Sequence, residues 1–198
     1  MRYGAEHKAE SKGRILECAA RQIRAKGPHK VSVAEVMSAA GLTHGAFYAH
    51  FASKDALVAE AVSEMFSEAA DRAGGLRDLA AFEGEALRKA LRDYLDGYLS
   101  SSHRDRPDRG CPLPSLASDM TRSGAAARKN FSAGIDLMTG RIGMALTRLG
   151  RASPDNEARA IVARMVGALS LARAIGPGAE SDAILRDSRD AIFQELGL

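Results

Sequence analysis

The sequence of 198 residues lacks the features that mark membrane proteins and disulfide-rich secreted proteins. It has no tryptophan, six prolines and only two cysteines, Cys18 and Cys111. Two cysteines cannot build a disulfide framework, which favours a reducing compartment. No apolar run approaches the roughly 20 residues that a membrane-spanning helix needs, and the first residues lack the apolar stretch of a signal peptide. We therefore expect a cytoplasmic protein that does not contact a membrane.

Signatures of catalysis and metal binding are also missing. No Cys/His cluster has the spacing of a zinc site, and the glycine-rich nucleotide motifs and the Gly-x-Ser-x-Gly motif of hydrolases do not occur. The five histidines lie singly along the chain, and we identify no catalytic pair of a histidine with a carboxylate. The sequence therefore predicts no catalytic residue, no metal and no cofactor.

Positive charge is concentrated near the N-terminus. Residues 1–54 hold nine Lys and Arg against four Asp and Glu, which gives +5. Residues 55–198 hold nineteen against twenty-one, which gives −2. A small basic segment before a nearly neutral body indicates that only the segment meets a polyanion.

Helical periodicity runs through the chain, and no convincing strand alternation interrupts it. The spacing predicts an all-α fold of about nine helices. They are expected at about residues 9–26, 33–40, 44–50, 54–74, 83–100, 112–120, 131–149, 154–175 and 181–196. The polar residues 101–110 are expected to form a loop.

Local signals near the N-terminus are typical of a helix-turn-helix. Ser32 and Glu35 have the spacing of a capping box, in which each satisfies a free backbone donor at the start of a helix. Gly41 permits a sharp turn, and Thr43 is suited to cap the helix that follows it. Ser53 is expected to cap the next, longer helix.

The short helix at about residues 44–50 has the composition of a helix that enters a DNA groove. Gly45 and Ala46 on its first turn have almost no side chain, so the backbone could approach base edges closely. Glycine in a helix costs roughly 1 kcal/mol relative to alanine, which indicates a compensating gain. Phe47 and Phe51 are expected to form the buried side. The alternative is a loose helix turn that contacts no DNA.

Polar groups suited to DNA flank this turn. The side chains of Thr43, Tyr48, His50 and Lys54 offer hydroxyl, imidazole and ammonium groups that match phosphate oxygens. His44 could contact a base edge or remain solvated. His50 could equally be a hydrogen-bonding residue of the protein surface.

Residues from about Ile15 to Leu57 resemble the DNA-binding domain of the TetR family of transcriptional regulators. The matching motifs are Ile15-Leu16, Ala19-Ala20, Gly27, residues 32–36 (SVAEV), 40–43 (AGLT), Gly45, 47–48 (FY), 50–51 (HF) and 53–57 (SKDAL). Gln22-Ile23 and Met37 depart from the family's usual residues, at positions that concern packing of the domain.

The resemblance implies a helix-turn-helix domain at residues 1–54 and a helical effector-binding and dimerisation domain at 55–198. It implies a homodimer, joined through the last two helices, that binds a double-stranded, near-palindromic operator as a repressor. A small molecule that binds the larger domain would release the DNA. In family members, residues that match Thr43, His44 and Gly45 face the groove. In the same family members, residues that match Ser32, Tyr48, His50 and Lys54 bind phosphates of the DNA backbone.

The effector itself is expected to be largely apolar. Aromatic, Met and Leu residues on the central helices have the composition of an accommodating pocket, although ordinary core packing explains them as well. These residues are Tyr94, Tyr98, Phe131, Met138, Met165 and Leu169.

Cys111 is a candidate sensor. Residues 109–120 resemble a Gly-Cys-Pro stretch in one branch of the family, in which some regulators sense electrophiles or oxidants through a cysteine. Arg109 and the start of a helix just after Cys111 would both favour the thiolate. The alternative is a small apolar residue that fills a turn.

Two other classes of protein remain open at this stage. One is a helical enzyme or small-molecule carrier whose basic segment is incidental. The other is an architectural protein that binds DNA without sequence preference. A charge of +5 is modest for purely electrostatic binding, and Gly45 suits direct contact with a groove, so the sequence favours a specific regulator.

Overall fold

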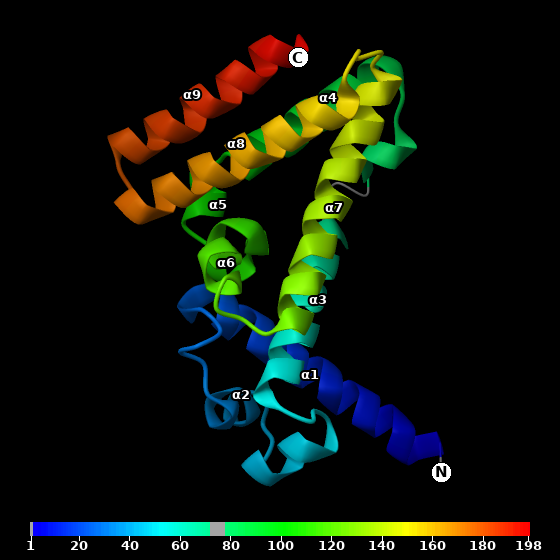
Figure 1. The fold of residues 1–198 in the computed structure, drawn as a ribbon, viewed down its shortest axis with the longest axis vertical. Helices are drawn as coiled ribbons and strands as arrows, with labels where there is room; N and C mark the ends of the chain where they lie inside the picture. The colour runs from blue at the N-terminus through cyan, green and yellow to red at the C-terminus, as the bar shows by residue number, and fades with distance from the viewer. Residues whose placement is uncertain (1, 72–77) are drawn as a thin grey trace. The chain divides into compact units, whose positions relative to one another are not determined.

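The computed structural model describes residues 2–71 and 78–198, and helices account for every regular element within them (Figure 1). These residues contain no β-strand, and all nine expected helices are present, which confirms the all-α fold. The elements, with η for 3₁₀-helices, are α1 (Arg2–Lys26), α2 (Val33–Ala39), η1 (His44–Ala49), α3 (Lys54–Asp71), η2 (Asp78–Ala81), α4 (Gly84–Tyr98), α5 (Ser101–Arg104), η3 (Pro107–Arg109), α6 (Pro112–Met120), α7 (Ala125–Arg148), α8 (Pro154–Ile175) and α9 (Ala179–Leu196).

The chain divides into two compact units. The first consists of residues Met1–Ser67 and Cys111–Ala133, and the second of Glu68–Gly110 and Gly134–Leu198. Helix α6 and the start of α7 thus join the N-terminal helices although they lie far along the chain. The expected boundary after Lys54 divides the chain by function and stays a prediction, because the compact units follow a different division.

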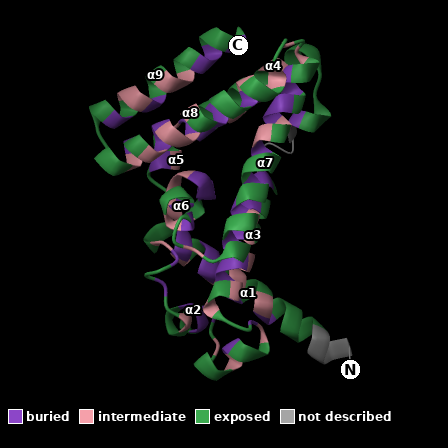
Figure 2. Cartoon of the chain, viewed as in Figure 1, coloured by how far each residue is buried: buried purple, intermediate pink, exposed green. Residues whose placement is uncertain are grey.

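The first unit is built around α1. Ile15, Ala19 and Ile23 recur every fourth residue and are fully buried, as the spacing predicts (Figure 2). Helices α2 and α6 both pack against α1. The amide nitrogen Nδ2 of Asn130 on α7 donates to the Ala59 carbonyl oxygen on α3 at 2.8 Å, which fixes the start of α7 to this unit.

The second unit buries the apolar faces of α4, α8 and α9. Leu87, Leu91 and Leu95 of α4 are completely buried, and α8 packs along α9. The predicted apolar stripe of α7 is buried only in part. Its middle residues, such as Ile142, are buried, but the Ile135 side chain is 36% exposed.

Several boundary predictions were wrong. Helix α7 begins at Ala125, six residues before the expected start at residue 131. Residues 101–110 contain α5 and η3, because Ser100 caps α5 by accepting a hydrogen bond from the His103 backbone N–H at 3.2 Å. Helix α1 begins at Arg2 because the polar residues that precede the apolar stripe are mostly good helix formers. Helix α9 begins at Ala179, and Ser181 lies inside it, fully buried. The expected end of the fourth helix, near residue 74, falls outside the described residues.

Candidate nucleic-acid interface

Helix α2 begins with the predicted capping box. The Glu35 backbone N–H donates to Ser32 Oγ, and the Ser32 backbone N–H donates to Glu35 Oε2, both at 3.1 Å. The Ser32 backbone N–H and the Ser32 hydroxyl both donate to Glu35 Oε2, and together with the nearby Lys26 charge they lower the pKa of the Glu35 carboxyl. The Ser32 hydroxyl, which we expected at a phosphate, therefore already serves the cap.

A glycine turn redirects the chain after α2. Gly41 has φ +70°, a left-handed conformation that side-chain-bearing residues rarely adopt. The Leu42 N–H donates to the Met37 carbonyl oxygen at 2.9 Å, and the Gly41 N–H donates to that of Ser38 at 3.0 Å. This turn sets the direction in which η1 leaves α2.

The predicted recognition helix is a 3₁₀-helix, η1, rather than an α-helix. Gly45 and the neighbouring aromatic residues are weak helix formers, and the segment is too short to compensate for them. Thr43 occupies the N-cap position, but its side chain makes no capping hydrogen bond, contrary to our expectation. Its exposed hydroxyl thus remains available to a ligand.

Two phenylalanines hold η1 against the unit. Phe47 is 1% exposed and Phe51 is 2% exposed, and their rings stack with centroids 5.6 Å apart. The expectation that they form the buried side is confirmed. Burial of this side directs the opposite side of η1 towards solvent.

The outward side of η1 is short of side-chain bulk. Thr43, His44 and Gly45 are exposed, and Ala46 is half-buried. A Cβ placed on Gly45 would meet no atom within 4 Å, so the protein's own packing does not require glycine there. Tyr48 is 70% exposed and rests edge-on against the Phe47 ring.

The remaining two predicted phosphate ligands lie beyond η1. The Nδ1 atom of His50 is buried without a hydrogen-bond partner among the described residues. Burial, followed by the charges of Lys8 and Lys12, lowers the pKa of the His50 imidazole. Lys54 Nζ donates to the His29 carbonyl oxygen at 3.3 Å, which orients its ammonium group.

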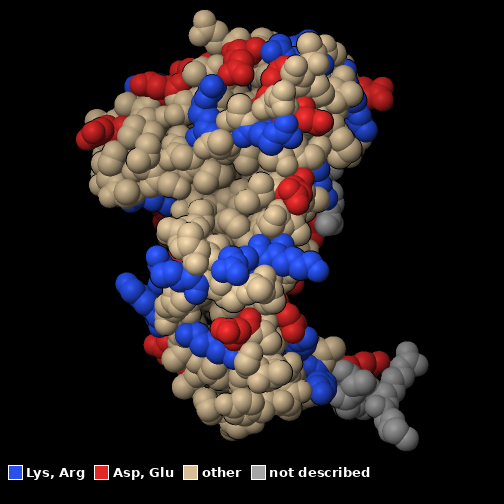
Figure 3. Space-filling model, viewed as in Figure 1, with Lys and Arg blue, Asp and Glu red and all other residues tan. Residues whose placement is uncertain are grey.

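Formal charge is missing from the recognition segment, which we define as residues 36–53. The segment contains no Asp, Glu, Lys or Arg. In Figure 3, the surface at the foot of the view, where Figure 1 draws η1, is largely uncharged, and Lys and Arg side chains lie on the neighbouring surface. Lys8 and Lys12 of α1 did not appear among the predicted site residues, because the packing of α1 beside Phe51 cannot be read from local spacing.

The predicted effector residues are distributed over both units. Tyr94, Tyr98, Met138, Met165 and Leu169 belong to the second unit, and all but the half-buried Tyr94 are buried. Phe131 belongs to the first unit, where its ring packs edge-on against Phe66 with centroids 5.8 Å apart. Their grouping as a pocket stays a prediction.

Cys111 forms no disulfide, is 8% exposed and occupies the N-cap position of α6. The glycine before it has a packing role within the second unit. A Cβ on Gly110 would lie 2.7 Å from both Arg173 Nη2 and His103 Nε2, so a larger residue there would displace these two side chains. The guanidinium of Arg109 is paired with Asp108, with Nε 3.7 Å from a carboxylate oxygen.

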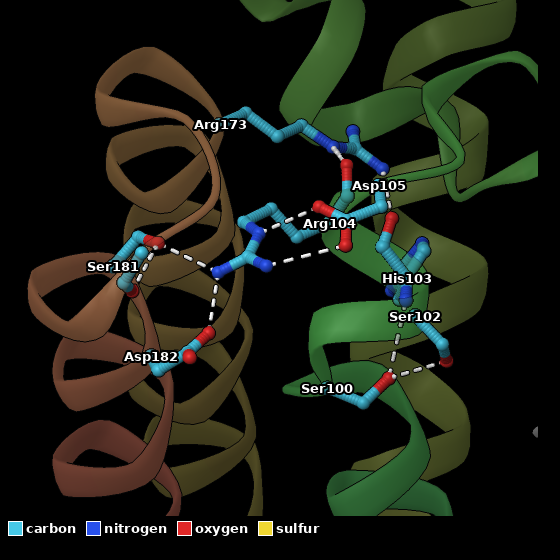
Figure 4. Close-up of polar contacts among 9 residues, drawn as sticks. Ser100, Ser102, His103, Arg104, Asp105, Arg173, Ser181 and Asp182 are labelled. Atoms are coloured by element: carbon cyan, nitrogen blue, oxygen red, sulfur yellow. Dashed lines mark hydrogen bonds and ion pairs between the residues drawn. The ribbon is translucent and has the colours of Figure 1, made fainter.

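Sequence reasoning missed a buried polar cluster in the second unit (Figure 4). The Arg104 guanidinium donates to Ser181 Oγ at 2.6 Å and to the carboxylates of Asp182 and Asp105. Arg173 Nη2 donates to the His103 carbonyl oxygen at 2.9 Å. The cluster joins α5 to α8 and α9. No sequence signal pointed to it, since its members come from segments far apart in the chain.

Metal and membrane sites find no support in the described part of the chain. No three His, Cys, Asp or Glu side chains of residues 2–71 and 78–198 gather in a way that could hold a metal ion. None of the helices described combines the length and the apolar character needed to cross a bilayer.

The family model described as bacterial regulatory proteins, tetR family, matches residues 15–61. A Bacillus subtilis (strain 168) protein, the uncharacterized HTH-type transcriptional regulator YdgC, is 38% identical over 58 residues. That match covers 29% of this chain and 30% of YdgC, so the sequence likeness is confined to less than a third of either protein.

Solved structures extend the likeness to nearly the whole chain. A TetR-family transcriptional regulator from Agrobacterium tumefaciens is 26% identical, with a TM-score of 0.77, over 93% of this chain and 98% of that one. The reduced form of Escherichia coli NemR has a TM-score of 0.80 over 93% of this chain and 96% of that one. At 18% identity, NemR supports the fold alone.

Proposed function

Because this chain belongs to the tetR family of bacterial regulatory proteins, we propose that it is a repressor that binds a near-palindromic operator as a homodimer. A small, largely apolar effector then releases it from the DNA. The family consists of DNA-binding regulators of transcription and not of enzymes. One observation carries the proposal. The first turn of η1 is exposed and almost without side chains, while Phe47 and Phe51 bury the opposite side.

This arrangement suits direct recognition of base edges. The major groove of B-DNA is about 12 Å wide, so a short helix with little side-chain bulk can place its backbone close to the bases. The free hydroxyl of Thr43 and the imidazole of His44 supply hydrogen-bonding groups on the outward side. Tyr48, His50 and Lys54 bind phosphates and set the register of η1 on the duplex.

Helices α8 and α9 supply the dimer interface. Leu171 is 58% exposed and Ile175 is 48% exposed, one turn apart on α8. Other apolar residues of α8, such as Met165 and Leu169, are completely buried inside the unit. An exposed apolar pair on a helix that already packs on α9 favours burial against a second copy.

The effector binds in the second unit. The aromatic and Met side chains of Tyr94, Tyr98, Met138 and Met165 offer a mainly apolar and adaptable environment. A mainly apolar small molecule matches that environment. A screen of small molecules for release of the operator complex would identify the effector.

Selection of bound sequences from random double-stranded DNA tests the proposal. We expect enrichment of an inverted repeat whose half-sites are separated by about one helical turn, 10–10.5 base pairs, or a multiple of it. Preference for the selected site over unrelated DNA should persist as salt is raised, because direct base contacts do not depend on counterion release. If no sequence is enriched, with or without candidate effectors, the regulator assignment fails. If the affinities for the selected site and for unrelated DNA instead fall equally as salt is raised, the protein is an architectural one.

A cysteine-based switch is the second candidate, and Cys111 carries it. The residue forms no disulfide, lies at the N-cap of α6, and belongs to the same compact unit as η1. Helix α6 packs on α1, so a covalent change at Cys111 could alter the unit that holds the DNA-binding residues. Its 8% exposure means that a reagent reaches it only after local opening.

Titration of the operator complex with a thiol-reactive electrophile tests the switch. Release should occur in the wild type and in Cys18→Ser, but not in Cys111→Ser. Cys18 is the matched control, because it is the only other cysteine in the sequence. Identical release in all three proteins would reject Cys111 as a sensor and leave the repressor proposal intact.

A further inference from the structure

The recognition segment needs cations from elsewhere in the molecule. Protein affinity for duplex DNA depends strongly on neutralisation of phosphates by Lys and Arg. Residues 36–53 contain neither, and Lys54 just beyond them supplies only one ammonium group. The cations that bind phosphates beside η1 must therefore come largely from neighbouring elements of the first unit.

Helix α1 brings a lysine to the C-terminal end of η1. Lys12 Nζ lies 5.3 Å from the centroid of the Phe51 ring and 2.6 Å from Glu60 Oε2 on α3. A cation over an aromatic face and beside a carboxylate is held in place rather than free to move. Lys12 is thus a positioned charge next to the aromatic residues that anchor η1.

A second lysine lies one turn earlier on the same face. Lys8 is four residues before Lys12 in a continuous α-helix, so the two side chains are neighbours. Lys12 lies beside the ring of Phe51, the residue that follows His50, and the charges of both lysines help to lower the pKa of the His50 imidazole, after the larger effect of burial. Lys8 is exposed and has no ion pair or hydrogen bond within the described residues.

The charges around His50 do not balance. Lys8 and Lys12 supply two positive charges on one face of α1, and Glu60 on α3 pairs with Lys12. The Nδ1 atom of His50 also lacks a partner in the described part of the chain. This corner of the first unit thus carries uncompensated positive charge directly beside the end of η1.

We propose that the first turns of α1 form part of the DNA interface, where Lys8 and Lys12 bind a backbone phosphate beside His50. The inference rests on the proposed DNA-binding function and extends the interface beyond the helix-turn-helix. A phosphate supplies the negative charge that the lysine pair lacks. Because every nucleotide has the same phosphate, the contact adds affinity and salt dependence without sequence preference.

The test compares Lys8→Gln with the wild type in the full chain, on the operator obtained by selection and on an unrelated duplex. We expect the variant to lose affinity for both duplexes by the same factor. The slope of log K against log[salt] should become shallower by about 1 for each DNA-binding domain, or about 2 for the dimer. Lys89→Gln is the matched control, because Lys89 is an exposed lysine of α4 in the second unit. It removes the same charge and should leave the slope unchanged.

The outcomes separate this inference from the function on which it rests. A wild-type slope in Lys8→Gln, with operator binding intact, would overturn the phosphate contact and leave the regulator assignment standing. An equal change in slope for Lys89→Gln would attribute the effect to net charge and would also overturn the contact. Absence of sequence-selective binding in the wild type itself would instead refute the proposed function.

Discussion

Arg104 and Asp182 lie 78 positions apart in the sequence, yet Arg104 Nη1 donates to Asp182 Oδ1 at 2.5 Å. The Arg104 side chain is only 5% exposed, whereas Asp182 is half-exposed. The same guanidinium also bonds Ser181 and Asp105. A buried cation is stable only with such partners, so the contact fixes α5 to the first turn of α9.

Removal of the Arg104 guanidinium should destabilise the second unit. In Arg104→Leu, the buried Ser181 hydroxyl and two carboxylates lose their donor, so we expect a lower Tm and a lower urea midpoint. Arg186→Leu is the control, since Arg186 pairs with Asp187 on the exposed surface and such pairs contribute little. Circular dichroism of both variants provides the measurement. Equal Tm values would show that the Arg104 cluster does not stabilise the unit.

Gly45→Ala should separate DNA binding from stability. Its added methyl group meets no protein atom within 4 Å, and alanine favours helix by up to about 1 kcal/mol, so the variant should be at least as stable as the wild type. The same methyl group holds η1 away from the base edges and should weaken operator binding.

Gly97→Ala on α4 is the matched control, since a Cβ there also meets nothing. Thermal unfolding and fluorescence anisotropy with labelled operator are measured on both variants. Retention of full operator affinity by Gly45→Ala would contradict the close approach of η1 to the groove.

Leu171→Arg should dissociate the dimer. A charged side chain at this exposed apolar position of α8 would be buried without a partner in the interface between copies. Sedimentation should show monomers at concentrations at which the wild type is dimeric, and operator affinity should fall because one half-site is lost. Met144→Arg on α7 introduces the same charge at a position that is 55% exposed and should remain dimeric. A dimeric Leu171→Arg protein would move the interface away from this face of α8.

Acid should remove the contribution of the Glu35 cap. Hydrogen bonds from Ser32 lower the pKa of the Glu35 carboxyl in the folded state below its ordinary value of 4.5. The stabilisation is therefore complete above pH 4.5 and is lost as the pH falls through the folded-state pKa. Glu35→Gln should lower the urea midpoint at pH 7, and its difference from the wild type should shrink towards pH 3. A difference that is the same at both pH values would show that the carboxylate charge does not stabilise the cap.

Loss of the Ser32 hydroxyl provides a partner experiment for the cap. Ser32→Ala should cost about 1 kcal/mol of unfolding free energy, as is usual for an N-cap residue. If Ser32 also binds a phosphate, the operator affinity of Ser32→Ala should fall by more than that of Glu35→Gln. Equal operator affinity of the two variants would confine Ser32 to the cap.

The helices could be predicted wherever each one buries an apolar face. Ile15, Ala19 and Ile23 locate α1 from sequence alone because burial every fourth residue leaves a clear pattern. The helical segments at residues 101–109 leave no such pattern. Contacts from Arg104 to α9 hold them, and those contacts depend on a tertiary arrangement that local sequence does not encode.

The candidate site shows the same division. The buried roles of Phe47 and Phe51 and the cap at Ser32 follow from local spacing, and they are found as predicted. The free hydroxyl of Thr43 and the place of Lys8 beside His50 do not follow from it. The first depends on the 3₁₀ geometry of η1, and the second on the early start of α1.

The uncharged recognition segment has a consequence for how binding preference can change. If Thr43 and His44 contact bases as proposed, substitutions there would alter which bases are favoured. The charges that attract the protein to any duplex would stay the same, since residues 36–53 hold none of them. The rate of non-specific association with DNA and the preference for one sequence would thus depend on different residues of the same domain. Each can be modified by mutation without disturbing the other.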